Sequence, residues 1–257
     1  MNDTVNILSE LSGIAREMLW GSALVFLRVG AMMALLPAFG EQSVPQRLRL
    51  VLALAFTAVV APAVWDAVPQ EGLLLPAGIE VAAGLALGIG LRLFVMALQI
   101  AGAIAAQATS LSQLFGGAGP EPQPAVTHVL VSAALALAVM NGLHVTAAQF
   151  LITSYEVLPP GAFPDSSEFA RWGLQQISQT FALAFSLAAP FTIAALRYNL
   201  ALGVINRALP SLMVSFIGAP ALSGGGLVLL SLLSPVVLAV WLQALSGFFE
   251  APFGSLP

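Results

Sequence analysis

Residues 208–249 contain no charged side chain, and neither do residues 172–196. Apolar stretches of this length can cross a bilayer, which takes about 20 predominantly apolar residues per helix. The composition agrees, because 59% of the 257 residues are hydrophobic and 8% are charged, whereas a soluble domain carries about 25% charged residues. The sequence therefore predicts an all-α fold, a polytopic integral membrane protein of long, kinked helices and helical hairpins.

The ionisable side chains argue against several classes of function. The net charge is −4, so the chain offers no basic field for nucleic acid. It contains no cysteine and two histidines, which leaves no thiol nucleophile and few ligands for a metal. The sequence has neither a hydrolase motif of the Gly-x-Ser-x-Gly or His-Glu-x-x-His type nor a phosphate-binding loop. We expect no catalytic residue, no metal and no cofactor, and therefore not an enzyme.

Charges and turn residues divide the chain into apolar segments. We predict membrane-spanning helices at residues 18–38, 48–65 and 125–152. Residues 73–115 exceed one bilayer at about 1.5 Å per residue, so they form either one long bent helix or two pieces. Residues 116–124 combine three glycines with three prolines and cannot be regular helix.

The second half has one polar stretch between its apolar segments, at residues 155–171. It is the only loop long enough to form a small feature outside the membrane. Residues 208–249 contain the sequence Ser-Gly-Gly-Gly at 223–226. Because glycine weakens a helix, this segment forms either one kinked helix or two short ones.

Arg28 and Glu80 each lie within an apolar segment. Charges at membrane depth are costly and usually paired, so an ion pair between these two buried charges is one hypothesis. Gly84 and Gly88 follow Glu80 at four-residue intervals, which puts the three on one helix face where another helix can approach closely. Such packing is the favoured interpretation. The alternative is a proton-coupled secondary transporter that uses a buried Glu80, although the sequence shows no clear inverted repeat.

Small side chains dominate residues 102–124, and residues 212–226 have a similar character. One interpretation is tight helix packing followed by a turn. The other is a flexible apolar element that lines or plugs a pore, because irregular backbone at membrane depth must line a cavity or be buried in protein. The sequence leaves both open.

Together, these segments resemble the FliR/SctT family of type III secretion export-apparatus proteins. The likeness extends over nearly the whole chain and rests on the order and spacing of weak motifs. Arg28 in FLRVG and the segment with Gly102 and Gln107 belong to the pattern, together with five further motifs. They are PAFGEQSVPQRLRLVLALAFTAVVAP at 37–62, EVAAGLALGIGLRL at 80–93, NGLH at 141–144, SYEVLPPG at 154–161 and NRALPSLMVSFIGAP at 206–220. The isoleucine and glycine of the last motif are more similar to the flagellar branch than to the virulence branch.

The resemblance implies a subunit of the flagellar type III protein export gate in the bacterial inner (plasma) membrane, at the flagellar basal body. In flagellum biogenesis such a subunit serves protein transport and secretion, by forming and plugging a pore for unfolded export substrates. The implied partners are FliP-like and FliQ-like subunits, FlhB-like and FlhA-like export components, and membrane lipid, with no nucleic acid.

The resemblance also implies a division of the chain. Residues 1–165 would form a FliP-like N-terminal helical part with a plug segment, and residues 166–257 a FliQ-like C-terminal helical hairpin. The tip of that hairpin would contain Arg207 and Pro210. The plug or gate residues implied in this way are Leu111, Leu114, Phe115, Gly116 and Gly117.

Overall fold

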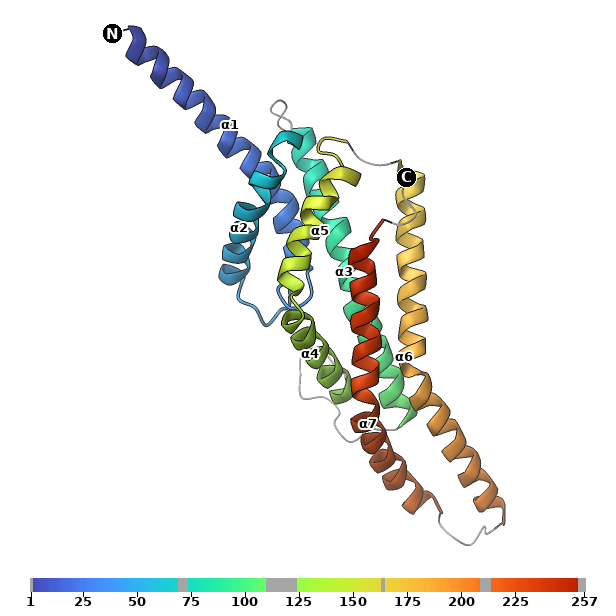
Figure 1. The fold of residues 1–257 in the computed structure, drawn as a ribbon. Coiled ribbons are helices and arrows are strands. Elements are labelled where there is room, and N and C mark those ends of the chain that lie inside the picture. The colour runs from blue at the N-terminus through green and yellow to red at the C-terminus, as the bar shows by residue number, and fades with distance from the viewer. Residues whose placement is uncertain (1, 69–73, 110–123, 163–164, 209–213, 254–257) are drawn as a thin grey trace. The chain divides into compact units, whose positions relative to one another are not determined.

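The structure is a computed structural model, and it describes residues 2–68, 74–109, 124–162, 165–208 and 214–253 (Figure 1). Within these residues the chain forms seven α-helices and one short 3-10 helix, without a strand. The predicted all-α fold is therefore confirmed. Two compact units divide the chain, and each is described by itself.

The first unit comprises residues 1–92, 142–174 and 251–257. Its core includes one face of the first helix, where Val25, Val29 and Met32 are fully buried at the spacing of an amphipathic helix. Its helices are α1 (Asn2–Met33), α2 (Gln46–Ala63), η1 (Trp65–Ala67), the first part of α3 (Leu74–Ala108), α5 (Leu143–Val157) and the start of α6 (Ser166–Ala208).

The second unit comprises residues 93–141 and 175–250. It contains the rest of α3 and α6, together with α4 (Ala125–Met140) and α7 (Val214–Glu250), and α4 contacts α7. Trp241 is fully buried, and its indole Nε1 donates a hydrogen bond to the carbonyl oxygen of Phe94 at 2.8 Å. Phe94 also packs against Phe248, with ring centroids 5.4 Å apart. Aromatic contacts therefore join α7 to α3 within this unit.

Four described helices are long and apolar enough to cross a membrane. They are Gln46–Ala63, Leu75–Ala108, Ser166–Ala208 and Ala221–Glu250, and α4 with α5 would form a fifth if the two make one broken span. These lengths and compositions bear out the prediction of a polytopic membrane protein.

Two predicted segments end or break where the backbone forbids a helix. α1 stops at Met33 instead of residue 38, because Pro37 lacks the N–H that a continuing helix needs and Ala38 has a φ of 68°. The predicted span at residues 125–152 is broken, since it divides into α4 and α5 at Gly142, whose φ is 82°. Glycine adopts this left-handed conformation without steric cost.

Where the sequence allowed either one long helix or two shorter ones, the described residues form one long helix. The described part of the segment after residue 73 is one helix, α3, up to Ala108. α7 runs from Val214 to Glu250 without a break at residues 223–226. α6 continues past the uncharged stretch and through Arg197 to Ala208. Arginine favours helix, so the end of an apolar stretch does not end α6.

Candidate functional site

A buried ion pair lies in the interior of the first unit. Arg28 on α1 and Glu80 on α3 have exposed side-chain fractions of 0% and 1%. The guanidinium donates hydrogen bonds to both carboxylate oxygens. Arg28 Nε lies 2.7 Å from Glu80 Oε2, and Arg28 Nη2 lies 2.9 Å from Glu80 Oε1. The structure thus brings together the two charges that the sequence predicted to be buried.

Three neighbouring groups complete the buried cluster. Arg28 Nη1 donates to Ser154 Oγ at 3.2 Å, and Arg28 Nη2 donates to the carbonyl oxygen of Leu158 at 2.8 Å. The Tyr155 hydroxyl donates to Glu80 Oε2 at 3.2 Å. The Tyr155 ring faces the guanidinium, with Arg28 Cζ 3.7 Å from its centroid, a distance that allows a cation–π interaction. All three nitrogen atoms of the guanidinium therefore have partners, and so do both carboxylate oxygens.

This arrangement is that of a clamp between three segments. A buried charge without a partner is strongly destabilising, but a pair whose remaining hydrogen bonds are satisfied can be retained in an interior. Arg28 belongs to α1, Glu80 to α3, and Ser154 and Tyr155 to α5. Removing α1 or α3 would leave one ionised group in the interior without its counter-charge, and removing α5 would leave part of the pair's hydrogen bonds unmade. We call these five residues, Arg28, Glu80, Ser154, Tyr155 and Leu158, the clamp.

Two glycines of α3 let α1 come close beside the clamp. A β-carbon added at Gly84 would overlap the carbonyl oxygen of Arg28 and lie 2.8 Å from Ala31 Cβ. One added at Gly88 would lie 2.9 Å from Leu35 Cβ and 3.1 Å from the carbonyl oxygen of Met32. The predicted close packing along this helix face is therefore present.

A known protein family and several named relatives match most of this chain. The family described as bacterial export proteins, family 1, matches residues 19–248. The chain belongs to this family. Three relatives carry the name flagellar biosynthetic protein FliR. The Caulobacter vibrioides protein is 34% identical, and the alignment covers 86% of this chain and 90% of the relative. The Escherichia coli K12 protein is 29% identical, with 82% of this chain and 83% of the relative covered. The Bacillus subtilis protein is 26% identical, with 84% of this chain and 87% of the relative covered.

The family assignment confirms the resemblance seen in the sequence. The matched residues include the whole clamp and both glycines of α3. They leave out the first half of α1 and the chain after Phe248. The export-family match therefore spans both compact units.

A second ion pair anchors the loop after α1. Arg92 Nη1 donates to Glu41 Oε1, and the two side chains are 29% and 18% exposed. Arg49 donates to the carbonyl oxygens of Val44 at 3.0 Å and Glu41 at 3.1 Å. The turn region between α1 and α2 is thereby held at residues 41–44, close to the start of α2.

Other predicted site residues lie elsewhere. Arg207 is exposed in the last turn of α6. Pro210 and the five predicted plug residues, Leu111, Leu114, Phe115, Gly116 and Gly117, lie outside the described residues. Their roles stay predictions, as does the division of the chain at residue 165. In the described part of the chain, no group of three or more His, Cys, Asp or Glu side chains could hold a metal ion.

Sequence reasoning did not assign a role to Ser154, Tyr155 or Leu158. All three stand in the motif SYEVLPPG, which contributed to the family resemblance. Their hydrogen bonds to Arg28 and Glu80 link residues 75 to 130 positions apart. Such partners follow from the fold and have no local signal. The one hint in the sequence was that these polar residues follow directly after an apolar segment.

Proposed function

We propose that this chain is a subunit of the flagellar type III protein export gate in the bacterial inner membrane, within the flagellar basal body. The observation that carries the proposal is the match of the bacterial export family to residues 19–248. The relatives named flagellar biosynthetic protein FliR, which align with 82–86% of the chain, support the flagellar system. The four to five apolar helices support a membrane location.

The finer part of the proposal concerns the pore. Residues 1–165 form a FliP-like part and residues 166–257 a FliQ-like hairpin whose tip contains Arg207 and Pro210. The subunit assembles with FliP-like and FliQ-like proteins, beside FlhB-like and FlhA-like components, around a path for unfolded export substrates. A plug of Leu111, Leu114, Phe115, Gly116 and Gly117 closes that path. Glycine-rich, apolar sequence between α3 and α4 supports this assignment, because it suits an irregular backbone that lines or blocks a pore.

The clamp fits a structural subunit better than a transporter. A carboxylate that carries protons has to exchange partners and reach water during its cycle. Glu80 is 1% exposed, and both of its oxygens are bonded to Arg28 or Tyr155. The proton-coupled secondary transporter is therefore not favoured. In the proposed export gate, the clamp sets the positions of α1, α3 and α5.

Substitutions in the plug segment test the pore assignment. In cells that lack the chromosomal copy, we expect the double variant Leu114→Ala/Phe115→Ala to increase ion leakage across the inner membrane, because the closing side chains are truncated. We expect Gly116→Val/Gly117→Val to reduce flagellar secretion, because valine restricts the backbone. Membrane permeability, motility and secreted flagellin are the measurements.

A matched glycine variant controls for the bulk of valine. Gly78→Val changes an exposed position of α3 where an added β-carbon meets nothing within 4 Å. It should leave secretion and permeability unchanged at equal amounts of protein in the membrane. If the plug variants also leave both readouts unchanged, the plug assignment is wrong, while family membership stands.

A further inference from the structure

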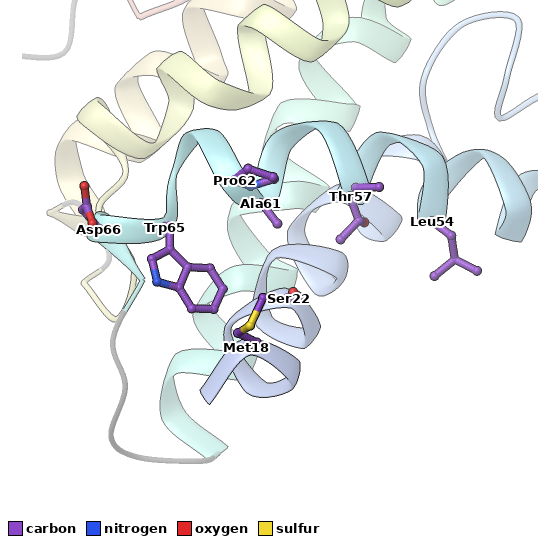
Figure 2. A pocket seen from close by; sticks show the side chains of 9 residues that line it. Met18, Ser22, Leu54, Thr57, Ala61, Pro62, Trp65 and Asp66 are labelled. Atoms are coloured by element: carbon purple, nitrogen blue, oxygen red, sulfur yellow. The ribbon is translucent and has the colours of Figure 1, made fainter. Parts of the chain in front are cut away.

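An open groove runs between α1 and α2 in the first unit. Its volume is about 840 Å³, within the range of about 300–1,000 Å³ that holds small molecules in proteins. Figure 2 shows Met18 and Ser22 on α1 facing one side of α2, with Leu54 at one end and Trp65 and Asp66 at the other. The lining residues are Met18, Ser22, Leu54, Thr57, Ala58, Ala61, Pro62, Trp65 and Asp66.

Most of the groove lining is apolar, and its two hydroxyl side chains are Ser22 and Thr57. Thr57 is the one threonine among the lining residues, and its hydroxyl donates to the carbonyl oxygen of Ala53 at 2.7 Å, so that bond is made within α2. Met18 and Leu54 border the groove with exposed fractions of 55% and 51%. α2 is long and apolar enough to cross a membrane, and lipid tails can reach a rim on such a helix.

The length and the polar end of the groove fit one leaflet. From Leu54 to Ala63, the last residue of α2, the helix rises about 14 Å at about 1.5 Å per residue, which is close to half of a hydrocarbon core of about 30 Å. Beyond α2 lie Trp65 and Asp66 (Figure 2). Tryptophan is enriched at the membrane–water boundary, and the Trp65 ring is fixed there because Gly21 leaves room for it.

Asp66 gives the end of the groove its charge. It is the only charged residue among the lining residues, and it is exposed. Within the described residues no ion pair or hydrogen bond of its carboxylate occurs. An exposed carboxylate at the headgroup level complements an ammonium group, and an apolar groove below it complements an acyl chain.

We propose that this groove binds a membrane lipid with an ammonium-bearing headgroup. One acyl chain lies along α2 between Met18 and Leu54, and the headgroup ammonium pairs with Asp66. Apolar contact alone gives an acyl chain little preference for the groove over the bilayer, because lipid tails are as apolar as the side chains. The headgroup pair therefore selects the lipid, and the fit of the chain holds it. The site does not depend on the export role.

Native mass spectrometry of the purified full-length chain tests the proposal. The protein is titrated with phosphatidylethanolamine, which carries an ammonium group, and with phosphatidylglycerol, which does not. We expect a phosphatidylethanolamine adduct that survives in the wild-type chain and is lost in Ala58→Trp, since Ala58 lines the groove and is exposed. Val59→Trp is the control, because Val59 is 62% exposed on α2 and does not line the groove. Equal adducts in the two tryptophan variants would overturn the proposal.

Asp66→Asn tests the headgroup pair. We expect it to weaken phosphatidylethanolamine binding about twofold to fivefold, as for an exposed ion pair, and to leave phosphatidylglycerol binding unchanged. The same change for both lipids, or no change for either, would contradict the pair. The natural chain lacks cysteine, so a single cysteine placed at Ala58 reports the occupant in native membranes. Its cross-linking to another protein would show that a partner helix fills the groove, and the lipid proposal would then be wrong.

Discussion

α3 and α7 are both long, apolar helices, but they are held in different ways. In the most apolar window of α3, 56% of the residues are buried inside the protein, against 22% in the corresponding window of α7. α3 carries Glu80 and Arg92, and both are paired with groups on other segments. α7 has no charged residue before Glu250. It is joined to α3 by Trp241, whose indole reaches the carbonyl oxygen of Phe94.

The difference shows what positions a helix in a membrane protein. Lipid tails are as apolar as leucine, so burying apolar surface between helices gains little from the hydrophobic effect. Position must come from close contacts and polar bonds. α3 has both, in the clamp and in the glycine face against α1. The exposed side of α7 is left for lipid or for other subunits, as the proposed assembly requires.

The largest expected effect comes from breaking the clamp. Arg28→Met leaves the Glu80 carboxylate buried without its counter-charge, and we expect a loss of about 3–5 kcal/mol in the free energy of unfolding. Denaturant titration in detergent measures it. Arg197→Met, at an exposed position of α6, is the control and should change stability little. Equal stability of the two variants would show that α3 is not held by the clamp.

The double variants sharpen this prediction. Arg28→Met/Glu80→Met removes both charges, and we expect it to regain much of the stability lost in Arg28→Met. Exchange of the two charges should not restore it. A carboxylate at position 28 would face the carbonyl oxygen of Leu158, which can only accept a hydrogen bond. Restoration by the exchange would mean that the clamp bonds contribute less than the ion pair alone.

The glycine face of α3 should give the next largest effect. Gly84→Ala forces a β-carbon into the Arg28 backbone, and overpacking of this kind costs about 1–3 kcal/mol. Gly78→Ala meets nothing within 4 Å and should gain up to about 1 kcal/mol from helix propensity. Thermal unfolding followed by circular dichroism separates the two. A Gly84→Ala variant as stable as Gly78→Ala would argue against close approach of α1.

The Gly-Gly-Gly run of α7 allows the same comparison on a weakly buried helix. A β-carbon at Gly226 would lie 2.7 Å from Thr109 Cβ, whereas one at Gly225 meets nothing within 4 Å. We expect Gly226→Ala to cost about 1 kcal/mol, at the lower end of overpacking effects, because a side chain and not the backbone is displaced. Gly225→Ala should be neutral or stabilising. The reverse order would show that α7 does not contact residue 109 in this way.

The smallest effect concerns the start of α6. The Ser167 hydroxyl and N–H, and more weakly the Glu168 N–H, donate to the Asp165 carboxylate and lower the pKa of this group below 3.8. These hydrogen bonds make the Asp165 carboxylate the N-terminal cap of α6. The cap stabilises the folded state above pH 3.8, and this stabilisation is lost as the pH falls through the lowered pKa. We expect Asp165→Ala to lower the unfolding midpoint slightly at neutral pH, with a difference that vanishes in acid.

Asp165→Asn provides the control for the cap. Asparagine keeps a capping oxygen but does not titrate, so its midpoint relative to Asp165→Ala should not depend on pH. Unfolding midpoints measured from neutral pH down to about pH 2 decide the case. A pH-independent difference between wild type and Asp165→Ala would show that the carboxylate charge does not contribute.

Much of the fold was predictable because membrane helices are marked by apolar length. The spans of α2, α3 and α7 follow from it. The break at Gly142 was missed although Asn-Gly is a turn signal, since the flanking residues are equally apolar. α6 runs on past the uncharged residues 172–196 to Ala208, because the end of an apolar stretch is a change of polarity and does not by itself stop a helix. Helix ends depend on backbone conformation and capping instead.

The clamp was predictable only in part. Two charges in apolar segments need partners, so Arg28 and Glu80 could be proposed as a pair from the sequence. Ser154, Tyr155 and the Leu158 carbonyl are brought to them by the packing of α5, which no local pattern encodes. The plug and hairpin-tip residues lie outside the described residues, and their roles rest on the resemblance and on experiment.

The most direct test of the export-gate account is what the chain assembles with. The tagged protein is purified from its native membrane in mild detergent, and the associated proteins are identified by mass spectrometry with the intact mass of the complex. We predict one large complex that contains FliP-like and FliQ-like subunits. A monomer or homodimer that binds a small solute would contradict it, and Glu80→Gln would then be the first variant to test for transport.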